Sequence, residues 1–464
     1  MSIRPVSVER QAIHSKRKLT HFVIATLLAL AHGSHAATIT VTSIADSGAG
    51  TLRAVLAGSA NGDTIKFAIS LPATITLTSG ELVVSKSVSI LGPGPANLAV
   101  DGNGLSRVFH VINGVTVTIS GLTITNGVTS GYSDGGGAGI YNDHSTLTVS
   151  NCILSGNSSA YYGGGINNDG ESGSATLTVI GSTLSRNSGY FGGGIHNRGV
   201  YGSAMLTVTA STFSSNWAGG LGGAIFNGNE SYDGTYFGSM VLRVSTSTFS
   251  GNSASSGGGG IMNSCARTTA PLTVSASTFS DNSSGPGNPS NYHVGAIFIV
   301  TYEGSAPLEI GDTILKANAS GVNILNLYSS PVISDGYNLS SDDAGGFLTA
   351  TGDQINTDPV LGPLQDNGGP TFTHALLPGS PAIDKGKRDA VAALANNTDQ
   401  RGFLRPVDNP AIANAPGGDG SDIGAFEVQR PGTPAPVVSP AGLLALVVLL
   451  SAVGWLALRR PARL

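Results

Sequence analysis

Two pairs of acidic residues in the middle of the chain could, by type and spacing, carry out hydrolytic chemistry. Asp169 and Glu171 form one pair, and Glu230 and Asp233 form the other, in loops of a repeated unit. A glycoside hydrolase needs two carboxylates on one surface at a fixed separation, and these four could converge. However, Asp169 and Asp233 each precede a glycine, as in an ordinary Asx-Gly turn. We therefore favour the turn interpretation over a catalytic one.

A second acidic group consists of Asp342, Asp343, Asp353 and Asp358. Calcium-dependent polysaccharide lyases need carboxylates that converge on one face, with an Arg or Lys as base. This stretch is rich in turn residues, so we expect turn and capping roles for the four aspartates. No cluster of His, Cys and Asp in the sequence has metal-ligand spacing. The sequence therefore predicts no metal, no cofactor and no catalytic residue.

The stretch FGGGIHNRG (191–199) places three glycines before His196 and Asn197, which suggests a ligand cradle. A phosphate-binding glycine loop would open a helix, whereas these glycines precede a strand-like segment. The same glycines recur in other copies of a repeat, where Tyr141, Asn167, Phe226 and Met262 occupy the position of His196. We therefore interpret the glycines as scaffold and His196 as a variable, outward-facing residue. His374 is expected to be structural.

Aromatic residues recur just before these glycines and are the better candidates for a binding surface. Planar side chains among Asn, Ser and Gly suit sugar rings or the surface of another protein. The alternative is that the rings cover loop backbone and pack on one another. The candidate strip comprises Tyr161, Tyr162, Tyr190, Phe191, Trp217, Tyr232 and Tyr236. Tyr201 and Phe237 belong with Tyr232 and Tyr236 to a second set, in the loops before the next Leu-Thr-Val copies.

These residues are positioned by an internal repeat. Segments such as LTVIGSTLSRN (177–187) and LTVSASTFSDN (272–282) recur with starts at 117, 147, 177, 206, 242, 272 and 308. Each is followed by a segment such as GGGINN (163–168) or GGAIFN (222–227). Alternation of Leu, Thr and Val has the period of a strand, and no segment of the repeat has helical periodicity.

About 30 residues with three short strands and Gly, Asn or Ser turns make one coil of a right-handed parallel β-helix, an all-β fold. Equivalent residues of successive coils then lie above one another at about 4.8 Å. The recurrent asparagines form two expected ladders of amide hydrogen bonds, and Asn tolerates the left-handed backbone of a tight corner. The first ladder is Asn157, Asn187, Asn216, Asn252 and Asn282, and the second is Asn142, Asn168, Asn197, Asn227 and Asn263.

Composition agrees with an extended, neutral surface. The chain has 66 glycines in 464 residues, only 11% charged residues and a net charge of −5, which argues against nucleic acid as a partner. Cys152 and Cys265 lie three coils apart, or roughly 14 Å at the stacking spacing. That separation exceeds the reach of a disulfide. We therefore expect two unpaired cysteines, with Cys152 as a small packing residue.

The two ends of the chain predict export and anchoring. Residues 1–36 read as a signal peptide, with basic residues, an apolar stretch and a small-residue cleavage site. Residues 429–440 form a Pro-rich linker, and 441–458 are eighteen uncharged residues, enough for a transmembrane or sorting helix. The basic tail, 459–464, is expected in the cytoplasm. Between them lie an N-terminal cap with a short helix (37–60), the β-helix (61–345) and a C-terminal module and cap (346–428).

Three features of the sequence resemble known bacterial surface proteins. The motifs FSSN (213–216) and GGAI (222–225) resemble the repeats of chlamydial polymorphic outer-membrane proteins. INTDPVLGPLQDNGGPTFTHALLPGSPAIDKG (355–386), with DQRGFLRP (399–406) and DIGAFE (422–427), resembles the choice-of-anchor Q module of secreted β-helices. The tail is similar to Gram-negative sorting signals of the IPTL type, although VVSPAG (437–442) stands at the motif itself.

The resemblance implies a protein of the Gram-negative cell envelope, anchored at a membrane by its C-terminal helix or released by a sorting protease. It implies no defined reaction. We expect a monomeric surface β-helix that functions in adhesion, by binding a polysaccharide or a protein on a host or neighbouring cell. The alternative is a polysaccharide lyase or glycoside hydrolase acting on an acidic or neutral polysaccharide.

Overall fold

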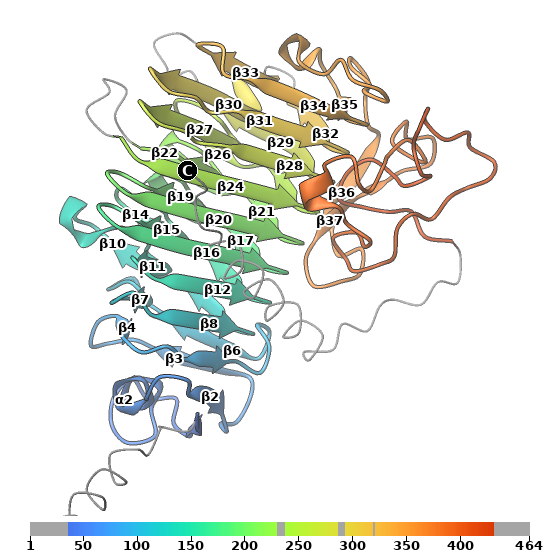
Figure 1. Ribbon diagram of the computed structural model, residues 1–464. Helices are drawn as coiled ribbons and strands as arrows, with labels where there is room; N and C mark the ends of the chain where they lie inside the picture. The colour runs from blue at the N-terminus through green and yellow to red at the C-terminus, as the bar shows by residue number, and fades with distance from the viewer. Residues whose placement is uncertain (1–35, 230–236, 286–292, 319–320, 431–464) are drawn as a thin grey trace, which may run out of the picture.

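The computed structural model describes residues 36–229, 237–285, 293–318 and 321–430. Parallel strands stack into a solenoid that rises from the N-terminal end, and a loop-rich C-terminal module lies along its side (Figure 1). The expected all-β parallel β-helix is confirmed. The expected signal peptide, transmembrane helix and basic tail fall almost wholly or wholly outside the described residues. Within the described ranges, no helix is long and apolar enough to cross a membrane.

Three long sheets form the walls of the solenoid, and each coil from β2 to β33 contributes one strand to each, whereas the first and last coils are incomplete. The first sheet comprises β1 (Thr38–Val41), β2 (Thr64–Phe67), β5 (Ser89–Leu91), β8 (Thr116–Ser120), β12 (Thr146–Ser150), β16 (Ser174–Ile180), β20 (Ser203–Thr209), β24 (Ser239–Ser245), β28 (Leu272–Ser275), β31 (Leu308–Gly311) and β34 (Val332–Gly336). The second comprises β3 (Ala73–Thr76), β6 (Leu98–Asp101), β9 (Thr123–Thr125), β13 (Ile153–Ser155), β17 (Thr183–Ser185), β21 (Thr212–Ser214), β25 (Thr248–Ser250), β29 (Thr278–Ser284), β32 (Ile314–Ala317) and β35 (Leu339–Ser340).

The third sheet comprises β4 (Leu82–Val84), β7 (Phe109–Val111), β11 (Ile140–Asp143), β15 (Ile166–Asp169), β19 (Ile195–Arg198), β23 (Ile225–Asn227), β27 (Ile261–Ala266), β30 (Val294–Tyr302) and β33 (Val322–Leu327). A fourth, short strand was not expected from the sequence. It lies at the corner between the second and third sheets, as β10 (Val128–Thr129), β14 (Ser158–Ser159), β18 (Ser188–Phe191), β22 (Trp217–Leu221) and β26 (Ser253–Ala254).

The repeat sets the register between coils, as the sequence predicts. Leu147 pairs with Leu177, and Leu177 with Leu206, so that each apolar position forms a column inside the solenoid. In the second sheet, the rings of Phe213 and Phe249 stack at 4.9 Å between centroids, nearly parallel. Because these columns are fully buried and continuous from coil to coil, apolar burial holds the solenoid together along its whole length.

The expected N-terminal helical cap is confirmed. The helix α2 (Leu52–Gly58) begins after Thr51, whose hydroxyl accepts a hydrogen bond from the backbone N–H of Ala54 at 3.2 Å. Its apolar face, Leu52, Val55 and Leu56, packs into the main core and contacts β1 and β4. The helix therefore covers the core at the edge of the first coil.

Both asparagine ladders form as predicted. In the first ladder, Asn157 donates from Nδ2 to Oδ1 of Asn187 at 2.9 Å, and Asn187 donates to Asn216 at 3.0 Å. In the second, Asn168 donates to Asn197 and Asn197 to Asn227, both at 2.7 Å. All ten amides are buried, so each bond satisfies polar groups that water cannot reach.

Asparagine was expected at the corners partly because it tolerates a left-handed backbone, and for the first ladder this expectation is wrong. The residue before each asparagine of the first ladder adopts the left-handed conformation, with φ between 53° and 65°, and the asparagine itself does not. Asparagine is used there for its side-chain hydrogen bonds rather than for its backbone. The left-handed residues at these corners are Gly156, Arg186, Ser215, Gly251 and Asp281.

Cys152 and Cys265 are both buried and free. Cys152 lies in register with Ser182 and Ser211, and its backbone N–H donates to the hydroxyl of Ser182 at 3.1 Å. Ser182 repeats this contact with Ser211 at 3.2 Å. The column is thus a ladder of hydroxyl hydrogen bonds, in which Cys152 replaces one serine.

The C-terminal module, residues 346–428, meets the solenoid in two places. Its first residues, Phe347 and Leu348, pack against the core beside the last coil, next to the short helix Ala344–Gly346. The remainder lies along the outer face of the second sheet, with the hairpin β36 (Leu361–Gln365) and β37 (Thr373–Leu376) beside the solenoid (Figure 1). Threonine hydroxyls of that face hydrogen-bond to the module. Thr212 donates to the Phe372 carbonyl and Thr248 donates to the Gln400 side chain. Thr278 accepts a hydrogen bond from the Ala425 N–H.

Candidate functional site

Four exposed aromatic side chains follow one another up the corner of the solenoid beside the third sheet. Tyr132 comes from a short 3-10 helix, Tyr161 and Tyr190 from the loops and strand β18 before the glycines, and Trp217 from the start of β22. Their exposed fractions are 59%, 37%, 48% and 50%. They belong to successive coils and follow the solenoid axis, although Trp217 is in register with Ser188 and only its ring reaches toward Tyr190. We call these four residues the aromatic strip.

Glycine backbone supports the upper half of the strip. A Cβ atom at Gly219 would lie 3.3 Å from both the Trp217 and Tyr190 rings, and one at Gly220 would lie 2.8 Å from Tyr190. A side chain at either position would therefore displace a ring. At the lower end, the rings of Tyr132 and Tyr161 meet edge to face at 5.2 Å. Close packing beneath and between the rings therefore fixes the positions of the side chains in the strip.

The other members of the predicted strip lie differently. Tyr162 is buried and Phe191 is half-buried, and their rings stack at 6.1 Å. They turn toward the outer face of the third sheet, away from solvent. Tyr232 and Tyr236, with Glu230 and Asp233, lie outside the described residues. Tyr201 and Phe237 are exposed and pair with each other edge to face at 5.0 Å.

His196 was predicted to be an outward-facing residue of the third sheet. Its side chain does point away from the core, but the expectation that it is exposed is wrong, because it is fully buried. It leaves the opposite side of β19 from the core residue Ile195 but lies beneath Tyr162 and against Phe226, with ring centroids 5.3 Å and 5.0 Å away. Its Nε2 lies 3.1 Å from the Gly228 carbonyl. Burial and the charge of Arg198 lower the pKa of His196 to about 3, so the imidazole is neutral.

A row of charged residues crosses the outer face of the third sheet below this aromatic packing. We call it the acid–histidine row, and it was not predicted as a unit. His110 lies between Glu81, at 2.8 Å from Nδ1, and Asp143, at 3.7 Å from Nε2. Tyr141 donates to Asp169 at 3.0 Å. The row comprises Glu81, Arg107, His110, Tyr141, Asp143, His144, Asp169, Glu171 and Arg198.

Every charged group in this row has a partner of opposite charge. Arg107 binds Glu81, His144 binds Asp143, and Arg198 binds both Asp169 and Glu171. Thus Asp169 and Glu171, which the sequence offers as a carboxylate pair, converge on one arginine.

The pKa values in the row do not favour a proton donor. Burial alone would raise the pKa of Glu81, but its hydrogen bond to His110 and the charge of Arg107 bring the value below its usual range. Its hydrogen bond to His110 likewise lowers the pKa of Asp143. Burial alone would lower the pKa of His110, yet hydrogen bonds to Asp143 and Glu81 raise it. The two carboxyls are therefore ionised, and a hydrolase needs one of its pair protonated.

The remaining candidates from the sequence have structural roles. Asp342, Asp343, Asp353 and Asp358 accept hydrogen bonds from backbone N–H groups, those of Ala344, Gly345, Ala350 and Val360 among them, so the turn and capping interpretation is confirmed. The buried His374 lies 3.0 Å from the Ser250 hydroxyl, at the contact between module and solenoid. In the part of the chain that the structure describes, no three His, Cys, Asp or Glu side chains could hold a metal ion.

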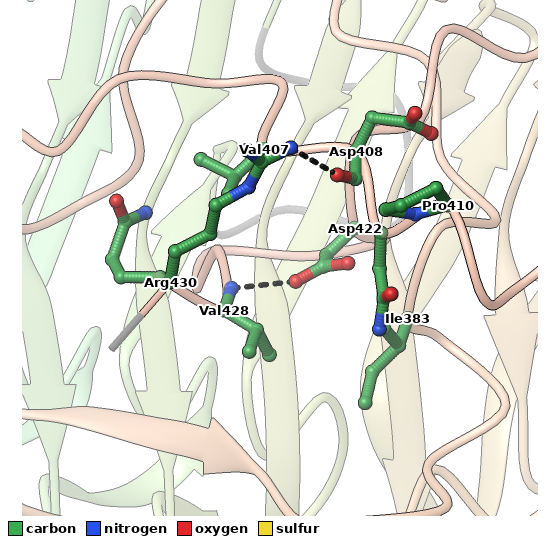
Figure 2. A pocket seen from close by; sticks show the side chains of 9 residues that line it. Ile383, Val407, Asp408, Pro410, Asp422, Val428 and Arg430 are labelled. Carbon is green, nitrogen blue, oxygen red and sulfur yellow. Dashed lines mark hydrogen bonds between the residues drawn. The ribbon is translucent and has the colours of Figure 1, made fainter. Parts of the chain in front are cut away.

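The C-terminal module contains a cavity of about 430 Å³ that sequence reasoning did not predict. Ile383, Val407, Pro410 and Val428 supply apolar walls, and Asp422 lies beside them (Figure 2). At its rim, Arg430 donates to the Asp408 carbonyl at 3.0 Å. Behind the cavity lies a buried ion cluster around Arg405. The motifs DQRGFLRP and DIGAFE supply most of its residues, and their concentrated charges, in a chain with only 11% charged residues, were the available signal.

Comparison with known proteins gives two similarities. The repeat of Chlamydia polymorphic membrane proteins matches residues 210–228 and 246–264. These segments run from the second sheet through the corner strand to the third sheet, and the first contains Trp217. The crystal structure of pectate lyase Pel9A is 14% identical and covers 85% of this chain and 97% of its own, with a TM-score of 0.45. A search of curated proteins gives no match.

Proposed function

We propose that this protein is a surface-displayed β-helix that binds a glycan through the aromatic strip. The observation that carries the proposal is the placement of Tyr132, Tyr161, Tyr190 and Trp217. Four large rings remain 37% to 59% exposed in successive coils, whereas the rings of Phe213, Phe249 and Phe279 in the same solenoid are completely buried. Other exposed aromatic side chains, such as Tyr302 and Tyr328, do not belong to this run of successive coils. Exposed apolar surface that runs continuously over a fold is typical of an interaction site.

The chemistry of the strip suits a sugar chain better than a charged partner. A ring face contacts the C–H surface of a sugar, and neighbouring Asn amides and Ser and Tyr hydroxyls can hydrogen-bond its hydroxyl groups. Successive coils offer such rings at a spacing of about 4.8 Å along the axis. An extended chain lying along the solenoid could therefore contact several rings at once. A protein surface rich in neutral polar groups is the second candidate ligand.

Display at the cell surface is supported by the repeats and by the ends of the sequence. The matched repeat belongs by name to membrane proteins of Chlamydia, and the same Gly-Gly and Asn positions build the coils here. The signal peptide expected at 1–36 would export the chain. The choice-of-anchor resemblance of 346–428 and the apolar segment 441–458 would attach it to the Gram-negative envelope, unless a sorting protease releases it.

The competing proposal is a polysaccharide lyase or hydrolase. The acid–histidine row is the one place where carboxylates of the described residues gather beside the strip, and each is paired with an arginine or histidine. Asp143 and Glu81 have lowered pKa values, which removes the protonated acid that hydrolysis requires. We therefore favour binding without cleavage.

The full-length protein should be incubated with a panel of neutral and acidic polysaccharides, and both retention and new chain ends should be measured. We expect retention of at least one neutral polysaccharide without new reducing or unsaturated ends. New ends that depend on the protein would contradict the binding proposal and support the enzyme. If no polysaccharide of the panel is retained, glycan binding is contradicted and the second candidate, a protein ligand of the same strip, would be tested.

A further inference from the structure

The contact between the C-terminal module and the solenoid contains an unbalanced set of buried charges. Four buried carboxylates surround two buried arginines, so the set has two more acids than bases. The acids are Asp312, Asp399, Asp422 and Glu427, and the bases are Arg401 and Arg405, all at most 5% exposed. A buried carboxylate without a cation is expensive in free energy unless it holds a proton.

Arg405 joins the two parts of the molecule. Its Nη1 lies 3.3 Å from Asp312, which is at the corner between β31 and β32 of the solenoid, and its Nε lies 3.2 Å from Glu427 of the module. Nη2 donates to the backbone carbonyls of Asp422 and Gly424, both at 2.8 Å. The guanidinium thus makes four hydrogen bonds, to two carboxylates and two carbonyls, and none of them goes to the Asp422 side chain.

Of the four acids, Asp422 is the one that forms no salt bridge within the described residues, although the nearby charge of Arg405 still acts on it. Asp399 has its own partner in Arg401, at 2.6 Å. The Asp422 carboxylate instead accepts the backbone N–H groups of Val428 at 2.6 Å and Asp384 at 2.8 Å. It also lies at the wall of the cavity in the module, which gives water and protons a route to it (Figure 2).

We propose that the charge set around Arg405 is a pH-sensitive clasp, which holds the C-terminal module against the solenoid while Asp422 is protonated and loosens when Asp422 ionises. Ionisation of Asp422 would add one more uncompensated negative charge beside Glu427 and weaken the packing of residues 421–427. The segment from Gly424 to Ala425 contacts the solenoid directly, because Ala425 donates to Thr278 at 3.1 Å and Gly424 donates to the Asp312 carbonyl at 2.9 Å. Loosening it would weaken the contact between the module and the face that it covers, which other hydrogen bonds and an apolar cluster also hold.

The titration of Asp422 falls in the range where such a clasp would respond. Burial, with the negative charge of Glu427, raises the pKa of Asp422 to about 7. Burial also raises the pKa of Asp312 and of Glu427. A carboxyl whose pKa is raised on folding stabilises the folded state least at high pH. The stability of the contact should therefore fall as pH rises from the unfolded value near 4 through about 7.

Other charged groups face this set from each neighbouring element. From the module, Asp384 lies next to Asp408 and Lys385, and Asp419 pairs with Arg388 at 3.4 Å. Glu309 of β31 and Asp335 of β34 form a further acid pair, in which burial and Glu309 raise the pKa of Asp335 to about 6. Lys387 lies nearby and pairs with Asp389 at 3.9 Å. Arg430 lines the same cavity as Asp422. These surrounding groups comprise six acids and four bases, so they do not supply enough positive charge to cancel the response.

Hydrogen–deuterium exchange of the full-length protein tests the clasp. Protection is measured at about pH 6 and about pH 8.5, corrected for the intrinsic exchange rate, which brackets the titration of Asp422. We expect peptides covering 371–374 and 421–427 to lose protection roughly tenfold at the higher pH. Peptides covering β20 should keep theirs. Asp422→Asn should remove most of the pH dependence, while the exposed Asp366→Asn should leave it unchanged.

Equal protection of the module at both pH values in the wild-type protein would overturn the proposal. So would a loss of protection in β20 equal to that of the module, since this would indicate global unfolding. If Asp422→Asn failed to fold, the wild-type comparison would still decide between these outcomes. None of these results depends on glycan binding by the aromatic strip, so the clasp and the proposed function fail separately.

Discussion

At the scale of the residue, Asn216 shows how much of the solenoid depends on single buried amides. Its Oδ1 accepts the backbone N–H and Nδ2 of Asn187, at 3.1 Å and 3.0 Å, and its Nδ2 donates to Asn252 and to the Leu184 carbonyl, both at 2.9 Å. Removing it leaves several polar groups without partners and without water. The ladder is therefore a condition for stacking the coils, beyond what apolar burial provides.

We predict that Asn216→Ala lowers the free energy of unfolding by about 3 kcal/mol or more, since each orphaned buried group costs about 1–3 kcal/mol. Urea unfolding measures the change. Asn97→Ala is the matched control, because Asn97 is exposed and makes one side-chain bond, to the Pro93 carbonyl. Its loss should be below about 1 kcal/mol. Equal losses in the two variants would contradict the role assigned to the ladder.

His196 gives a second prediction at this scale. Its pKa is lowered to about 3 by burial and Arg198, so the folded protein keeps it neutral while the unfolded chain binds a proton. Stability contributed by His196 is therefore complete above about pH 6.5 and is lost as pH falls toward 3. His196→Phe should reduce the loss of stability between about pH 6.5 and pH 4 by on the order of 3 kcal/mol. Thermal unfolding at both pH values tests this, and an unchanged acid sensitivity would refute it.

Sequence reasoning reached some residues and missed others for a physical reason. The columns of Asn157 and Asn142 could be predicted, because a repeat places its own copies above one another. The burial of His196 could not, because the residues that cover it, Tyr162 and Phe191, belong to loops whose path the repeat does not specify. The column assignment of His196 was right, while its surroundings depended on side chains outside the column.

At the scale of the element, the acid–histidine row joins five neighbouring strands or strand ends of the third sheet. The row holds four carboxylates, two arginines and two histidines, and the charges balance only when both histidines are protonated. Burial alone would lower the pKa of His144, but the Glu171 carbonyl and Asp143 raise it above its ordinary value, as Asp143 and Glu81 do for His110. The outer face of this sheet is therefore tied together most strongly at mildly acidic pH.

This balance predicts a pH dependence of opposite sign to that of His196. A histidine whose pKa is raised on folding contributes stability that is complete below about 6.5 and is lost as pH rises through the folded value. Exchange protection of β7 and β11 should thus decline above neutral pH, after correction for intrinsic rates. His110→Gln should flatten this decline, whereas His293→Gln, remote in sequence from the row, should not. A decline that persists in His110→Gln would refute the assignment.

Elements were predicted unevenly from the sequence. The three strands per coil and the cap helix α2 followed from alternation and from Leu52, Val55 and Leu56 at helical spacing. The short corner strand, such as β14, was missed because two residues carry no periodic signal. This corner strand matters for the site, because Trp217 is the first residue of β22 and forms one end of the aromatic strip.

At the scale of the whole molecule, the C-terminal module lies beside the solenoid as well as at its end (Figure 1). The contact between Asp312 and Arg405 joins residues 93 positions apart. No repeat or local motif indicates such a pairing, so the sequence could mark the motifs of the module but not the face that they cover. The covered face belongs to the second sheet. The module therefore leaves the aromatic strip, at the corner beside the third sheet, uncovered.

The central claim is that the aromatic strip binds a glycan, and the affinity of Trp217→Ala tests it most directly. For a polysaccharide retained by the full-length protein, we predict at least a tenfold weaker affinity, about 1.4 kcal/mol, in Trp217→Ala and in Tyr190→Ala. Tyr328→Ala, which removes a ring that is 76% exposed outside the strip, should bind like the wild type. Wild-type affinity in both strip variants, or an equal loss in Tyr328→Ala, would contradict the account.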